Sequence, residues 1–190
     1  LERLSHDLLL LGRMESRDIP LSRESIDFTE IVERVLKTME LIIENRRIDI
    51  EKHFDDNLPR ASIDADAMYQ AVLNLVDNAV THSPEGSTIS ILMKRIAKDG
   101  NMTGLCVEVQ DQGPGISDEQ ADKIWERFYK TDYARTRKEG KGSGLGLAIV
   151  KAVVERHGGY VTFRRASEGG AVLGFVLDGQ SICCHSSRSR

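Results

Sequence analysis

Two asparagines four residues apart, Asn74 and Asn78, are the first side chains whose spacing suggests shared chemistry. The apolar period around them predicts a helix from about Asp64 to His82, with Asp64 as its N-cap. Residues four apart lie on one face of a helix, so the two carboxamides point in the same direction. A polar stripe on the surface is the alternative interpretation of this segment when it is taken by itself.

Two glycine-containing segments follow. In 111–116, a carboxylate at Asp111 precedes Gly113 and Gly115, which let the backbone approach a flat ligand or turn tightly. In 142–147, three glycines run into a predicted helix, where free amides and the helix dipole favour phosphate. An ordinary turn and a glycine-rich hinge are the respective alternatives. The chain has no G-x-x-x-x-G-K-[ST] motif, and its glycine run follows a charged loop rather than a strand, which argues against a dinucleotide fingerprint.

Taken in order, these segments resemble the nucleotide-binding boxes of the ATPase domain of histidine kinases, a superfamily shared with gyrase and mismatch-repair ATPases. Residues 74–78 match the N box, 111–116 the G1 box, 125–129 the F box and 142–147 the G2 box. The resemblance implies an α+β fold, a two-layer α/β sandwich whose mixed sheet is covered by helices on one face. ATP would lie between helices and a mobile lid at 129–142.

The resemblance also implies roles for single residues. Asn78 matches the Mg²⁺ ligand, a neutral oxygen donor suited to a hard cation. Asp111 matches the adenine reader, whose carboxylate accepts from an exocyclic amine that guanine lacks at that position. Asn74, Arg127 and Lys130 are the expected catalytic residues, with the two cations near the terminal phosphate. The expected nucleotide contacts are Asn74, Asn78, Asp111, Gly113, Gly115, Ile116, Phe128, Gly142, Ser143, Gly144, Leu145, Gly146 and Leu147.

Asn74 separates kinases from hydrolases within this resemblance. The gyrase-like ATPases carry a glutamate there that activates water, and a carboxamide does not accept that proton at neutral pH. The sequence departs from the family pattern at Thr81 and His82, where a lysine and a tyrosine are frequent. His82 either stacks on the base or is a surface histidine. The basic residues of the lid either replace the missing charge or form a solvated loop; they are Arg135, Arg137, Lys138 and Lys141.

The triplet 5–7, Ser-His-Asp, resembles a phosphoacceptor box, but we reject His6 as the acceptor. The family's box continues with an arginine and a proline, whereas this chain continues with four leucines and Gly12. The leucine spacing predicts a helix that packs on a partner helix. We therefore expect 1–19 to be the C-terminal end of the second helix of a dimerisation hairpin, with the acceptor absent from this chain. His53, His157 and His185 are interpreted as structural or surface residues.

The remaining elements follow from hydrophobic period and turn residues. Helices are predicted at 28–43, at 117–128 with a capping box formed by Ser117 and Gln120, and at 145–153 before two glycines. Strands are predicted at 21–28, 48–54, 61–63, 89–96, 105–109, 160–165 and 171–177. The catalytic domain is expected to span 20–178. No structure is predicted for the Ser/Arg-rich tail at 179–190, which is expected to be disordered.

Composition excludes several other classes. With 26 basic and 30 acidic residues in 190, the net charge of -4 argues against a nucleic-acid partner. The three cysteines have neither metal-ligand spacing nor the density of a disulfide scaffold, so a reducing, cytoplasmic setting is expected. No apolar run approaches the roughly 20 residues that span a bilayer, so we expect no membrane contact by this segment.

The expected function is transfer of the γ-phosphoryl group of Mg²⁺·ATP to a histidine on the parent protein's dimerisation hairpin, within a homodimer. A response regulator would then receive the phosphoryl group. We expect this chain alone to be unable to phosphorylate itself. Two alternatives stay open on the sequence: a catalytically silent ATP-binding regulatory module, and a related serine kinase of the anti-sigma type.

Overall fold

The computed structural model describes residues 2–98, 101–130, 143–167 and 169–183. Its main sheet has five strands in the order β2-β4-β5-β7-β6. These are β2 (Asp49–Phe54), β4 (Thr88–Lys98), β5 (Asn101–Gln110), β7 (Ala171–Asp178) and β6 (Tyr160–Arg165). β2 runs parallel to β4 and the other neighbours are antiparallel, so the sheet is mixed, as predicted.

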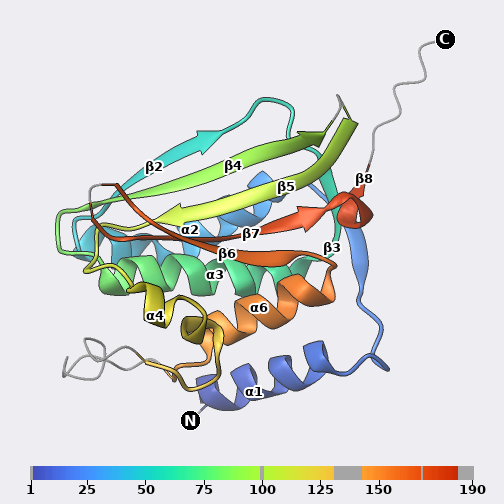
Figure 1. The fold of residues 1–190 in the computed structure, drawn as a ribbon, viewed down its shortest axis with the longest axis horizontal. Coiled ribbons are helices and arrows are strands. Elements are labelled where there is room, and N and C mark those ends of the chain that lie inside the picture. Colours follow the sequence, from blue (N-terminus) through green and yellow to red (C-terminus); the bar gives the residue numbers. More distant parts are fainter. Residues whose placement is uncertain (1, 99–100, 131–142, 168, 184–190) are drawn as a thin grey trace.

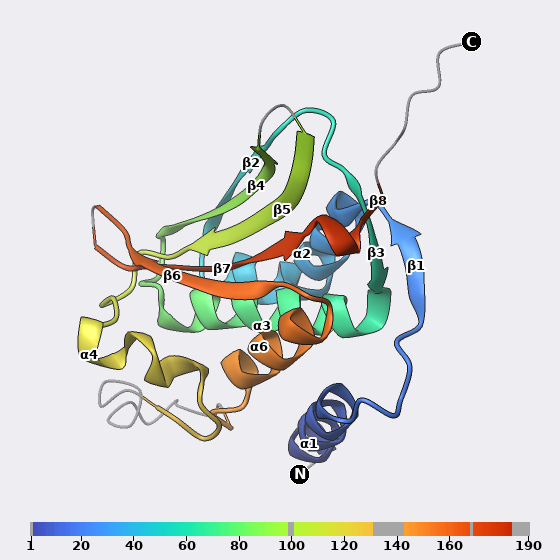
Figure 2. The ribbon, with the colours of Figure 1, turned by 45° about the vertical axis from the view of Figure 1, so that its right-hand side comes forward.

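Helices cover one face of this sheet (Figures 1 and 2). They are α2 (Phe28–Asn45), α3 (Ala65–His82) and α6 (Gly146–Arg156). Alternate residues of the strands, such as Ile89, Ile91 and Met93 of β4, are fully buried beneath them. The rings of Phe28 and Phe175 meet edge to face with centroids 5.9 Å apart, joining α2 to β7. The predicted two-layer sandwich is confirmed.

Helix α3 is the central element of the helical layer, and both of its ends are fixed by side chains. Asp64 is its N-cap and accepts from the backbone N–H of Ala67 at 3.1 Å, as the sequence predicts. At the other end, Arg46 donates to the carbonyl oxygens of Thr81 and Ser83 at 3.3 and 2.7 Å. These contacts satisfy carbonyls that a helix end leaves unpaired. The asparagines of α3 are therefore carried on a helix with little freedom to fray.

The N-terminal helix α1 (Glu2–Glu15) packs along α6 (Figure 1). Its buried contacts come from Leu11 and Met14, while Leu4, Leu8 and Leu9 remain exposed. Arg13 of α1 donates to Asp64 at 2.8 Å, which ties this helix to the cap of α3. The leucine stripe is thus only partly buried within this chain. No helix among the described residues is long and apolar enough to cross a membrane.

The helix predicted at 117–128 is wrong in its length. The structure has α4 (Asp118–Ala121), then the 3₁₀ turn η1 (Lys123–Trp125), and an extended Glu126. Gln120 accepts from the backbone N–H of Ser117 at 3.2 Å, and the predicted capping box is present. Ile124 and Trp125 are both buried. Because these two consecutive side chains both enter the core, the backbone turns toward the core here and does not continue as a longer helix.

The prediction of no structure for the tail is wrong for its first part. After β7 the chain forms η2 (Gly179–Ser181) and β8 (Ile182–Cys183), and β8 pairs with β3 (Arg60–Asp64). β3 also pairs with β1 (Arg23–Ile26), which completes a second sheet of three strands. Ser181 is fully buried, and its hydroxyl donates to the carbonyl of His157. Residues 131–142, most of the expected lid, and 184–190 lie outside the described residues.

Candidate nucleotide site

Asn74 is not part of a surface stripe. It is only 5% exposed, and its Nδ2 is buried without a hydrogen-bond partner in the described part of the chain. A Cβ placed on Gly146 would lie 3.6 Å from Asn74 Oδ1, so the amide faces the beginning of α6. Asn78 is half-buried one turn further along α3. A buried amide group without a partner is costly, which makes this position suited to a polar ligand.

Asp111 lies just after the end of β5 and is 4% exposed. Its Oδ1 accepts from the backbone N–H of Gly113 at 2.8 Å and of Ala171 at 3.2 Å. Burial raises the pKa of this carboxyl, while the two amide hydrogen bonds and nearby His82 oppose the rise. Because both amides donate to Oδ1, the arrangement leaves Oδ2 to accept from a ligand.

The 111–116 segment meets the end of α3 through Gly113. A Cβ there would lie 2.9 Å from both Asp111 Oδ1 and the carbonyl oxygen of His82. Gly115 has a φ of 76°, a conformation that favours glycine, and Ile116 packs against the core. His82 thus lies close to Asp111. Thr81, next to it, is exposed.

The glycine run forms the beginning of α6. Gly144 has a φ of 75°, and its carbonyl accepts from the backbone N–H of Phe128 at 2.9 Å. Ser143 accepts from the N–H of Leu145 at 3.3 Å through its hydroxyl. Leu145 is fully buried and Leu147 packs against the core, so these two leucines anchor the turn. Gly142 lies outside the described residues.

The two expected cations differ in their surroundings. Arg127 forms an ion pair with Glu15 of α1, and both side chains are about half exposed. Lys130 is half-buried at the edge of the described segment. Phe128 is largely exposed with a φ of 61°, which is unusual for a bulky residue. α1 also reaches the glycine run, where the Ser143 hydroxyl donates to Asp7 at 3.5 Å.

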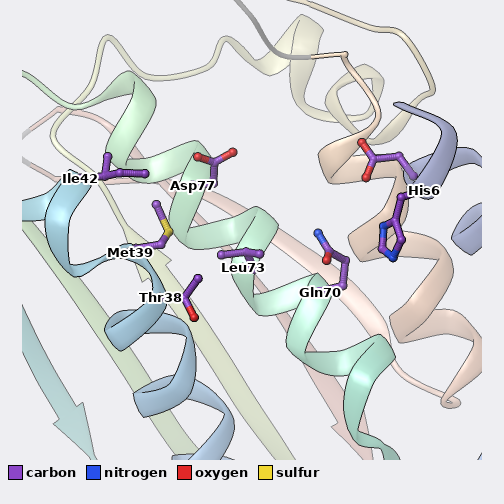
Figure 3. Close-up of a pocket in the computed structure, with 8 residues that line it drawn as sticks. His6, Thr38, Met39, Ile42, Gln70, Leu73 and Asp77 are labelled. Carbon is purple, nitrogen blue, oxygen red and sulfur yellow. The ribbon is translucent and has the colours of Figure 1, made fainter. Parts of the chain in front are cut away.

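His6 lines a pocket of about 490 Å³ between α1, α2 and α3 (Figure 3). The other lining residues are Asp7, Thr38, Met39, Ile42, Gln70, Leu73 and Asp77. His53 is exposed, in keeping with a surface role. His157 is fully buried and structural: its Nε2 accepts from the backbone N–H of Asp64 at 3.0 Å, and its Nδ1 bonds the carbonyl of Val153 at 2.7 Å. His185 lies outside the described residues.

The sequence interpretation missed Gly170 and Ala171, which contact Asp111. A glycine pair between two strands was a visible turn signal, but their position beside Asp111 depends on the register of β5 and β7. Among the described residues no group of histidine, cysteine, aspartate and glutamate side chains could hold a metal ion.

Comparison with known proteins identifies the family to which this chain belongs. Residues 63–181 match the family described as histidine kinase-, DNA gyrase B-, and HSP90-like ATPase. The chain is 35% identical to the sensor histidine kinase WalK of Bacillus subtilis (strain 168), over 92% of this chain and 28% of the relative. The chain therefore spans less than a third of the length of that relative.

Two solved structures agree in fold. The mycobacterial sensor histidine kinase MprB has a TM-score of 0.67 and 32% identity, covering 84% of this chain and 99% of that one. Full-length ShkA, solved in complex with AMPPNP, has a TM-score of 0.78 and 27% identity, covering 95% of this chain and 36% of that one. The chain thus belongs to the histidine kinase-, DNA gyrase B- and HSP90-like ATPase family, as the ATP-binding catalytic domain of a sensor histidine kinase.

Proposed function

We propose that this domain binds Mg²⁺·ATP along α3 and donates the γ-phosphoryl group to a histidine on a helical hairpin of its parent protein. The observation that carries the proposal is the pairing of two features at two points along α3. Buried Asp111 lies where α3 ends, and the unpartnered amide of Asn74 lies against the beginning of α6. A base at the first and phosphates at the second would span the segment that carries Asn78.

The surroundings of Asp111 and the beginning of α6 each suit one part of the nucleotide. Oδ2 of Asp111 accepts from the exocyclic amine of adenine, and the low polarity around this buried carboxylate makes a wrong base costly. The free amides at the beginning of α6 favour phosphate oxygens. Asn78 is the expected ligand of Mg²⁺, whose contribution when bound is to neutralise phosphate charge.

Asn74 favours transfer to a protein side chain over hydrolysis. Its carboxamide orients a polar group but does not act as a general base at neutral pH, so water in the site is not activated. Phosphoryl transfer needs positioning and charge neutralisation more than covalent help. Arg127 and Lys130 supply positive charge near the terminal phosphate, which requires Arg127 to leave Glu15. A silent regulatory module and a serine kinase are not favoured, because the relatives are sensor histidine kinases.

The partners follow from this reaction. We assign residues 1–19 to the end of a dimerisation hairpin, in keeping with the exposed leucines of α1, and the chain from residue 20 through β8 to the catalytic domain. The acceptor histidine would lie on the remainder of that hairpin in a homodimeric parent, and a response regulator would receive the phosphoryl group. His6 is not the acceptor in this assignment.

The test uses the chain with labelled ATP and Mg²⁺, alone and with the parent's hairpin added as a separate protein. We expect no label on this chain and slow, acid-labile labelling of the hairpin, since the two parts are no longer tethered. Asn78→Ala should abolish that labelling, whereas Asn45→Ala, at an exposed position at the end of α2, should not. Acid-labile label on this chain that disappears in His6→Gln would overturn the assignment of the N-terminal helix.

A further inference from the structure

The connection between β6 and β7 lies at the same end of the sheet as the end of β5 (Figures 1 and 2). It closes with two glycines of nearly equal conformation, Gly169 with a φ of 92° and Gly170 with a φ of 91°. Their surroundings differ completely. A Cβ on Gly169 would meet nothing within 4 Å, whereas a Cβ on Gly170 would overlap the carbonyl oxygen of Asp111 and lie 2.8 Å from its carbonyl carbon.

This close approach sets the direction of the Asp111 carboxylate. Ala171, the residue after Gly170, accepts from the backbone N–H of Asp111 at 2.9 Å and donates its own N–H to Asp111 Oδ1 at 3.2 Å. The carbonyl of Gly170 also lies against Gly115, 3.2 Å from where its Cβ would be. A side chain at position 170 would push the two backbones apart and lengthen the bond to Oδ1, because there is no flexible group to give way.

We propose that Gly170 is a positioning residue that determines base selectivity, a role that rests on the proposed recognition of adenine by Asp111. The absence of a side chain at position 170 brings the Ala171 amide to Oδ1, and this contact holds Oδ2 in the direction of the base. Gly170 therefore acts on the choice between adenine and guanine through Asp111, without touching the nucleotide.

Gly170→Ala and Gly169→Ala form a matched pair, because both place alanine at the same unfavourable φ and only the first adds the overlap. Each variant is titrated with Mg²⁺·ATP and Mg²⁺·GTP by calorimetry. We expect Gly169→Ala to keep the wild-type ATP affinity and preference. Gly170→Ala should bind ATP about tenfold more weakly or worse, with a reduced preference over GTP. Adding Asp111→Asn to Gly170→Ala should cost little more, because both changes act on one contact.

Equal losses in the two glycine variants would assign the effect to backbone strain and overturn the proposal, as would an unchanged preference in Gly170→Ala or full additivity with Asp111→Asn. If Gly170→Ala does not fold, Ala171→Pro removes the same N–H at the first residue of β7, where proline is tolerated. The expected result is then the same loss of preference, and an unchanged preference overturns the proposal. Wild-type protein that fails to bind Mg²⁺·ATP would instead contradict the proposed function, and the positioning role falls with it.

Discussion

At the scale of single residues, the candidate site consists of polar groups whose burial is only partly offset within the described protein. Asn74 has a buried amide without a partner, and Asp111 keeps a carboxylate in surroundings that raise its pKa. Both arrangements cost stability in the free domain. A ligand that offers an amine donor at one end and oxygen atoms at the other would relieve both costs, so nucleotide binding is expected to stabilise the domain.

Asp111→Asn should separate stability from binding. Because burial raises the pKa of Asp111, its charged form is disfavoured in the folded state, and this cost is present once the pH rises through the folded pKa. The variant keeps Oδ1 for both amides and removes the charge, so we expect thermal unfolding at neutral pH at the same or a higher temperature. ATP affinity should fall by about 1–3 kcal/mol, since an NH₂ donor would then face the adenine amine. Asp49→Asn, at an exposed carboxylate, is the control. An unchanged ATP affinity would remove Asp111 from the site.

At the scale of elements, the site depends on how helices are tied together at their ends. His157 at the end of α6 accepts from the N–H of Asp64, which caps α3, and Arg13 of α1 reaches the same Asp64. The ion pair of Arg127 with Glu15 and the contact of Ser143 with Asp7 join α1 to the nucleotide-binding segments. A movement of α1 would therefore displace the glycine run and Arg127.

The contact between α3 and α6 should depend on pH through His157. Burial lowers the pKa of His157, the Val153 carbonyl and Asp64 oppose this fall, and Arg23 and Arg156 add to it. A histidine held neutral in the folded state stabilises fully above its unfolded pKa of about 6.5, and this contribution is lost as the pH falls below that value. Urea unfolding at pH 7.5 and 5.5 should show a stability loss at the lower pH that persists in His53→Gln and shrinks in His157→Gln. An equal pH dependence in all three proteins would contradict this account.

At the scale of the whole molecule, the last described strand, β8, pairs with an early strand, β3. β8 pairs with Arg60 and Ala61, far away in sequence, and this pairing lies beside the N-cap of α3. The second sheet thus joins the first described strand, the cap of the central helix and the end of β7. Residues 179–183 belong to the folded domain, and the boundary expected at 178 is too early.

Two shortened chains test that boundary. A chain ending at Asp178 lacks the buried Ser181 hydroxyl and leaves the carbonyl of His157 without its donor, whereas a chain ending at Cys183 retains both. We expect the shorter chain to be less stable by about 1–3 kcal/mol, the cost of a buried acceptor without a partner. The measurement is urea unfolding of the two chains side by side. Equal stabilities would mean that β8 and Ser181 contribute nothing to the fold.

The sequence by itself determined the features that depend on spacing along one element. Asn74 and Asn78 share a face, Asp64 caps their helix, and the strands alternate, because helical and strand periods are fixed by local geometry. It failed at 117–128 and after Asp178, where buried side chains and a distant strand decide the backbone. Only the tertiary structure brought Ala171 to Asp111 and Glu15 to Arg127. Such contacts join residues far apart in sequence. They depend on strand register and on packing, and the local period of a helix or strand specifies neither.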